Sequence, residues 1–103
     1  MRRYAFHPAA SIDLREIASF IAEDNPDAAL RVVDEIHATL VLLARFPQQG
    51  HKRPDLTSRS LRLAVVREYL IAYAPDKKPL WVVAILHGRR SPKTMAAILR
   101  SRP

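Results

Sequence analysis

The sequence predicts one α+β domain in which a helical hairpin packs on a small, mostly antiparallel sheet, with the element order β-α-α-β-β-β-(α). Two patterns predict this fold class. In the first half of the chain, apolar residues recur at the spacing of a single helix face, and in the second half three runs of strand length follow one another. The chain has 103 residues, too few for two independent cores. We therefore expect residues 1–103 to form a single domain.

The first elements are expected to be a short strand and a helix. Residues 2–6 have strand character, and Pro8 ends the run. Helical spacing then continues to Glu23, and proline suits the first turn of a helix because its missing N–H is not needed there. The residues expected to face the core from this helix are Ala10, Leu14, Ile17, Ala18 and Ile21.

A second helix is predicted from Asn25-Pro26 to Phe46-Pro47. Asparagine is a good N-cap and proline a good first helical residue, and the closing proline cannot continue a helix. The short connection makes the two helices antiparallel neighbours. The expected core face is Ala29, Val32, Val33, Ile36, Leu40 and Leu43.

The end of this second helix is unusual because residues 40–44 are apolar on all sides. One interpretation is a helix end buried under the sheet. The other is an exposed apolar groove that receives a partner helix or strand.

The second half of the chain has strand periodicity. Residues 61–66 and 69–74 are expected to form a hairpin with Arg67-Glu68 at the turn, and residues 75–79 a polar turn. Residues 80–87 are almost continuously apolar, which is typical of a central strand covered on both faces. Gly88 ends that strand. A short helix over 92–100 would face inward with Met95, Ala96, Ile98 and Leu99.

Composition excludes several classes of protein. The absence of cysteine excludes disulfide scaffolds, cysteine-ligated zinc and thiol catalysis. The two glycines provide no glycine-rich phosphate loop, and the four histidines are isolated, so we expect no cofactor and no metal. No apolar run approaches the roughly 18 residues of a membrane span, and the N-terminus has no apolar signal region. We therefore expect a cytoplasmic protein without a membrane partner.

The charge is unevenly distributed. Residues 1–50 contain five Lys and Arg against seven Asp and Glu, a net charge of −2, whereas residues 51–103 contain twelve against three, a net charge of +9. This asymmetry indicates an anionic partner, either nucleic acid or an acidic protein. A solvated basic surface that aids solubility is the alternative.

An arginine and a histidine in the expected sheet have the residue types for phosphate binding. Arg62 shares a strand face with small apolar residues, so it needs an anionic partner or a route to water. His87 ends the central strand, is expected on the face of Trp81, Val83 and Ile85, and precedes Gly88-Arg89-Arg90. The alternative for His87 is burial with a hydrogen bond to a backbone carbonyl. Together with the loop residues Lys52 and Arg53, these side chains would cradle a phosphate backbone.

Several segments carry a resemblance to a known family. They are residues 14–21, 25–29, 46–50, 53–56, 61–62 with 69–73, and above all Val82-Val-Ala-Ile-Leu-His-Gly-Arg-Arg90. In this order and spacing they resemble the RelE/ParE superfamily, the toxins of type II toxin–antitoxin modules. The resemblance implies growth arrest and a role in plasmid stabilisation. It also implies a cognate antitoxin that wraps a partly disordered segment around the toxin.

Two mechanisms divide that superfamily. RelE-like members are ribosome-dependent mRNA endonucleases, and Arg62 and Arg90 resemble their sheet arginines. ParE-like members poison DNA gyrase, and the His87-Gly-Arg-Arg run is more similar to theirs. Residues 91–97 also contain no Tyr or His, one of which a nuclease often has there.

The resemblance therefore favours a non-enzymatic, gyrase-directed toxin. A ribosome- and mRNA-directed nuclease using Arg62, His87 and Arg90 is the alternative, and a member that retains only partner binding is a third. The residues expected to bind the target or nucleic acid are Lys52, Arg53, Arg62, Arg89, Arg90 and Lys93, and those expected to bind the antitoxin are Leu40, Val41, Leu42 and Leu43.

Overall fold

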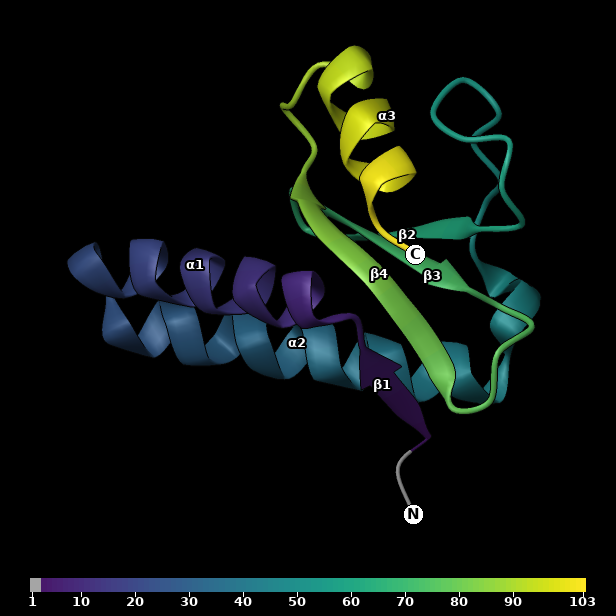
Figure 1. Cartoon of the computed structure of the whole chain (residues 1–103). Coiled ribbons are helices and arrows are strands. Elements are labelled where there is room, and N and C mark those ends of the chain that lie inside the picture. The colour runs from purple at the N-terminus through teal and green to yellow at the C-terminus, as the bar shows by residue number, and fades with distance from the viewer. Residues whose placement is uncertain (1–2) are drawn as a thin grey trace.

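The computed structural model describes residues 3–103 and has the predicted fold class and element order (Figure 1). The expected first strand is shorter than residues 2–6, and its first residue lies outside the described part of the chain. The elements are β1 (Tyr4–Phe6), α1 (Pro8–Asp24), α2 (Pro26–Arg45), the 3-10 turn η1 (Pro47–Gln49), β2 (Arg62–Val66), β3 (Tyr69–Ala74), β4 (Leu80–His87) and α3 (Pro92–Ser101).

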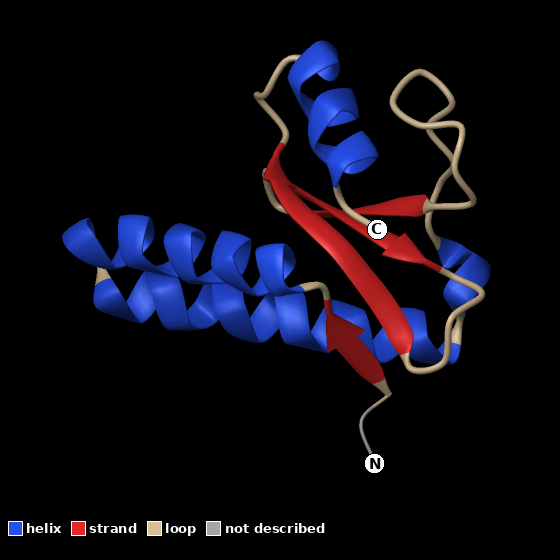
Figure 2. Ribbon diagram, in the orientation of Figure 1, coloured by secondary structure: helices blue, strands red, loops and turns tan. Residues whose placement is uncertain are grey.

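The four strands form one sheet in the order β1-β4-β3-β2. β1 runs parallel to β4, and the other neighbours are antiparallel. The α1–α2 hairpin lies on one face of the sheet and α3 on the other (Figure 2). β4 is a central strand with both faces covered, which explains its continuously apolar sequence.

The helical hairpin forms where local signals predict it. The Asn25 side chain accepts a hydrogen bond from the Ala28 backbone N–H at 3.1 Å, and Pro26 is the first residue of α2. Five of the six residues expected to face the core from α2 are buried, and Val33 is half-buried. From α1, Ala10 is buried and Leu14, Ile17 and Ile21 pack against the same core.

The central strand contains a β-bulge. The pairing of β3 with β4 passes from Ala72 opposite Ala84 to Tyr73 opposite Val82, so Val83 is an extra residue on β4. Val83 and Ala84 therefore both face the α3 layer, whereas Val82 faces the helical hairpin.

The bulge changes the face on which His87 lies. His87 and Ile85 are on the helical-hairpin side, while Trp81 and Val83 belong to the core under α3. The expectation that His87 shares a face with Trp81 and Val83 is wrong, because it assumed uninterrupted alternation along the strand. Its grouping with Ile85 is correct.

A carboxylate and a guanidinium occupy the bulge. One Asp13 oxygen accepts hydrogen bonds from the Ile85 backbone N–H at 3.0 Å and from Arg102 at 2.5 Å, and the other accepts from Arg102 at 3.1 Å. Arg102 also donates to the Val83 carbonyl at 3.2 Å. Both side chains are only 15% exposed. This cluster, the bulge clamp, joins α1, β4 and the C-terminal tail.

A second polar cluster fixes the segment after α2. The buried Tyr73 hydroxyl donates to the Pro47 carbonyl at 2.8 Å and accepts from the Gly50 backbone N–H at 2.9 Å. A Cβ at residue 50 would collide with the Tyr73 ring and hydroxyl, so glycine is required there. Burial raises the pKa of the Tyr73 phenol, and the Gly50 hydrogen bond and the Arg62 charge partly oppose that rise.

We predict that Asp13→Ala lowers the free energy of unfolding by about 3 kcal/mol, because it leaves the Ile85 N–H and the Arg102 guanidinium without their partner. Urea denaturation at neutral pH measures this change. Asp34→Ala is the matched control, since Asp34 is exposed on α2, and its effect should stay within about 0.5 kcal/mol. Equal losses for the two variants would contradict the prediction.

Tyr73→Phe should cost about 1–3 kcal/mol because it leaves the Gly50 N–H and the Pro47 carbonyl unpaired. Tyr69→Phe is the matched control: Tyr69 is also buried, but its hydroxyl makes no hydrogen bond to the described residues. The loss for the control should be smaller than about 0.5 kcal/mol.

The same pair of variants predicts a pH dependence. Because the folded-state pKa of Tyr73 is raised, the stability from its neutral phenol is complete below the pKa of an unfolded tyrosine, about 10, and is lost as the pH rises through the raised value. The difference in free energy of unfolding between wild type and Tyr73→Phe should therefore narrow above about pH 10. A constant difference up to pH 12 would exclude this role.

Candidate functional site

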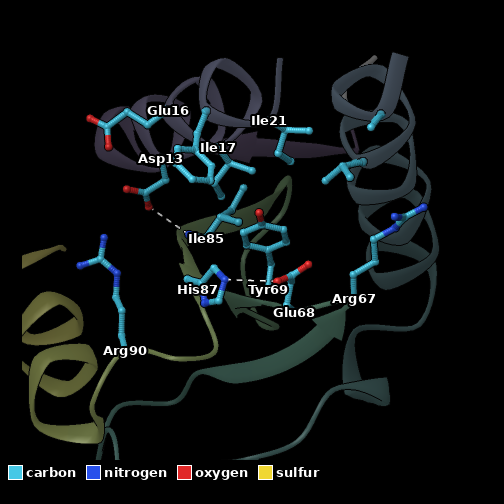
Figure 3. Close-up of a pocket in the computed structure, with 13 residues that line it drawn as sticks. Asp13, Glu16, Ile17, Ile21, Arg67, Glu68, Tyr69, Ile85, His87 and Arg90 are labelled. Atoms are coloured by element: carbon cyan, nitrogen blue, oxygen red, sulfur yellow. Dashed lines mark hydrogen bonds and ion pairs between the residues drawn. The ribbon is translucent and has the colours of Figure 1, made fainter. Parts of the chain in front are cut away.

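A cleft of about 510 Å³ lies between the helical hairpin and the end of the sheet where β4 ends and the β2–β3 turn lies (Figure 3). Its wall is apolar toward the core and charged at the rim. The apolar part includes Ile17, Phe20, Ile21, Val32, Tyr69 and Ile85, and the polar and charged part is Asp13, Glu16, Arg67, Glu68, His87 and Arg90.

His87 is held by three neighbours in this cleft. Its Nδ1 atom accepts a hydrogen bond from the Arg89 backbone N–H at 3.0 Å, and its Nε2 atom lies 3.4 Å from a Glu68 carboxylate oxygen. Its ring meets that of Tyr69 edge-on, with 5.4 Å between the ring centroids. Since Nδ1 is an acceptor, the neutral imidazole carries its proton on Nε2, facing Glu68. The expected backbone carbonyl partner is therefore replaced by a backbone N–H and a carboxylate.

Two tight turns place Glu68 beside His87. Arg67 has φ 55°, which allows the two-residue turn between β2 and β3. The Gly88 N–H donates to the Glu68 carbonyl at 2.7 Å, and a Cβ at residue 88 would lie 3.1 Å from that oxygen. Arg67 in turn pairs with Glu35 of α2 at 2.5 Å, which ties the turn to the helical hairpin.

The cleft can bind an apolar group flanked by charge. Tyr69 contributes a buried ring, and burial, with a smaller effect of Glu68, raises the pKa of its phenol. Both nitrogens of His87 already face a partner. An apolar wall with a charged rim suits an amphipathic peptide segment.

Arg62 lies away from this cleft. It is the first residue of β2, and its Nη1 atom donates to the Gly50 carbonyl at 2.7 Å. Its Nε atom is buried without a hydrogen-bond partner in the described structure. Within the described residues Arg62 forms no ion pair, and a neutral main-chain carbonyl takes the place of the expected anionic partner, so Arg62 holds the segment after η1 in place.

The predicted basic residues do not form one cradle. His51 pairs with Leu63 near the start of β2, so Lys52 and Arg53 follow at that end, whereas His87 and Arg89 lie at the end of the sheet where β2 finishes. The structure does not bring the two groups together at one end of the sheet, and their binding of a phosphate backbone stays a prediction.

In the loop after η1, Arg53 already has an acidic partner. Arg53 makes two hydrogen bonds to Asp55, at 2.9 and 2.8 Å, which raise the pKa of Arg53 and lower that of Asp55. Of the three residues of the nuclease alternative, His87 and Arg90 line the cleft, but Arg62 does not.

Part of the apolar end of α2 is buried and part is exposed, so each of the two interpretations holds for some of its residues. Leu40 and Leu43 are buried in the core, whereas Val41 and Leu42 are 46% and 45% exposed. Leu40 and Leu43 therefore have no surface for an antitoxin, and only Val41 and Leu42 remain candidates.

Sequence reasoning missed Phe20, Glu68 and Tyr69. Phe20 is 74% exposed and borders the cleft. The sequence does indicate its exposure, because Phe20 falls outside the apolar spacing that forms the core face of α1. Glu68 and Tyr69 carried no such signal, since their proximity to His87 depends on how β3 pairs with β4.

Residues 3–103 bring together no group of three or more His, Asp or Glu side chains able to hold a metal ion. None of the helices in the described part of the chain is both long and apolar enough to cross a lipid bilayer.

Comparisons with known proteins agree with one another. Residues 4–92 match the family model described as ParE toxin of type II toxin–antitoxin system, parDE. A protein of Sinorhizobium fredii (strain NBRC 101917 / NGR234) named "Putative toxin Y4kP" is 32% identical over 77 residues, covering 75% of this chain and 78% of that protein.

The fold is also similar to a solved structure, the chromosomal ParDE TA system from P. aeruginosa. The TM-score is 0.68 at 20% sequence identity, and the match covers 84% of this chain and 96% of the other. The match confirms the predicted helical hairpin on a mostly antiparallel sheet.

Proposed function

Since the chain belongs to the ParE toxin family of type II toxin–antitoxin systems, we propose that it arrests growth by acting on DNA gyrase and that a cognate antitoxin neutralises it. The observation that carries the proposal is the family match over residues 4–92, which spans all four strands, both long helices and the cleft.

Two further observations support gyrase over the ribosome as the target. Arg62, which resembles a sheet arginine of the nucleases, is engaged with the Gly50 carbonyl and lies apart from His87 and Arg90. The segment that follows Arg90 contains no Tyr or His. These features leave the three residues without the shared site that the nuclease alternative needs.

The antitoxin contact is proposed on the outer side of the helical hairpin. Large apolar side chains are exposed there, and exposed apolar surface marks protein interfaces. Leu42 and Phe46 are four residues apart and thus adjacent on the α2 surface, with Phe46 53% exposed. The proposed contact keeps Val41 and Leu42 from the predicted set and adds Phe46.

The gyrase proposal predicts that the purified toxin inhibits plasmid supercoiling by gyrase or accumulates cleaved gyrase–DNA complexes. The toxin premixed with its antitoxin is the control and should leave supercoiling unchanged. No effect on gyrase, together with mRNA cleavage on translating ribosomes, would establish the nuclease alternative instead.

For the antitoxin contact, the double variant Val41→Ser/Leu42→Ser should bind the antitoxin about 10- to 100-fold more weakly, because two half-exposed apolar side chains lose burial in the interface. Calorimetric titration with the purified cognate antitoxin measures this affinity. Val65→Ser is the matched control: Val65 is 68% exposed on β2, away from α2. Unchanged affinity in the double variant would place the antitoxin elsewhere.

A further inference from the structure

We infer that the outer face of α3 contacts the phosphate backbone of duplex DNA through three side chains, Arg89, Lys93 and Arg100, here called the α3 stripe. The inference deepens the proposed function, on which the choice of DNA as the nucleic acid rests. Arg100 was absent from the residues expected to bind nucleic acid.

The segment that contains the stripe has no negative side chain. Residues 77–103 include seven Lys and Arg and no Asp or Glu. One of the seven, Arg102, is neutralised by Asp13 in the bulge clamp. Arg89, Lys93 and Arg100 are exposed and make no ion pair within residues 3–103, so their charge faces solvent.

The helix geometry aligns two members of the stripe. Lys93 and Arg100 are seven residues apart, which places them on one side of α3 at about 10 Å along its axis. The buried Met95 and Leu99 lie on the opposite side, against the sheet. Arg89 lies two residues before the helix N-cap Ser91 and adds a third exposed positive charge near the N-terminal end of α3.

Two neighbouring arginines, Arg59 and Arg90, are directed elsewhere and do not belong to the α3 stripe. Arg59 donates to the carbonyls of Leu99 and Arg102 at 2.7 and 2.5 Å and thereby holds the C-terminal end of α3. Arg90 extends over the cleft toward Asp13 and Glu16 (Figure 3). The stripe is thus mounted on a fixed helix and is separate from the cleft.

The surroundings favour phosphate over an acidic protein. Protein interfaces depend on large apolar or aromatic anchors that become buried. Apart from Val65 on β2, the large exposed apolar side chains among residues 3–103 belong to α1, α2 and the residue after α2. Those helices cover the opposite face of the sheet from α3. Val65 alternates with Leu63 and therefore lies on the α3 side of the sheet, but it belongs to β2 and not to the stripe. The stripe itself offers charge without a large apolar anchor, as expected for backbone contacts to nucleic acid.

The same face favours a duplex over a single strand. Single-stranded DNA and RNA are bound largely by stacking of unpaired bases on aromatic rings. Residues 88–103 contain no Phe, Tyr, Trp or His. This segment therefore has no ring on which unpaired bases could stack, and its positive charges suit phosphates, which a duplex presents in regular rows.

Fluorescence anisotropy with a labelled 20-base-pair duplex and the full-length toxin tests the inference. Three phosphate contacts predict that log K falls against log salt concentration with a slope of about −2.7, or roughly a 40-fold loss between 50 and 200 mM salt. Lys93→Gln and Arg100→Gln should each reduce the slope by about 1. Arg31→Gln, exposed on α2, is the matched control and should keep the wild-type slope.

Unchanged slopes in Lys93→Gln and Arg100→Gln, with circular dichroism confirming folded variants, would overturn the inference. So would tighter binding of single-stranded RNA of equal length, or competition by poly-L-glutamate as effective as that of the duplex at equal charge. Gyrase assays on the same samples separate the two proposals. Inhibition of gyrase without duplex binding refutes the α3 stripe alone, and duplex binding through the stripe without inhibition refutes the gyrase target alone.

Discussion

The bulge at Val83 in the central strand is the constraint on which the arrangement of this molecule depends. β1 ends opposite Val82, so next to the bulge the Ile85 N–H and the Val83 carbonyl of β4 face Asp13 and Arg102 instead of a neighbouring strand. Buried backbone groups require partners, and here they come from both ends of the chain. The charges of Asp13 and Arg102 thus connect the helical hairpin, the central strand and the C-terminal tail.

The bulge also determines which side chains of β4 lie on each face of the sheet. It turns Ile85 and His87 toward the helical hairpin, where His87 meets Glu68 and Tyr69, and leaves Val83 and Ala84 to support α3. The sheet then separates the acidic first half of the chain, which supplies α1 and α2, from the acid-free segment that supplies α3. A charge imbalance along the sequence becomes a charge difference between two faces of the folded molecule.

Local signals predicted the elements, and long-range contacts account for what was missed. The Asn25 cap, the spacing along α2 and the apolar run of β4 depend on residues within a few positions of one another, so they can be recognised in the sequence. The face of His87 depends on a bulge that no local pattern marks. The partner of Arg62 is a main-chain carbonyl, which every residue has, so composition cannot indicate it.

The cleft lies between the helical hairpin and the end of the sheet, so its wall includes residues from both sides of the molecule. Phe20, on the helical hairpin, forms part of its wall, and Arg90, from the segment before α3, forms another part. A partner confined to the apolar side of α2 would leave the α3 stripe open to solvent, because the sheet lies between them. For an antitoxin on the hairpin to block a phosphate contact on α3, it must therefore extend around the end of the sheet, and the cleft is an apolar, charge-rimmed route along which an amphipathic segment can do so.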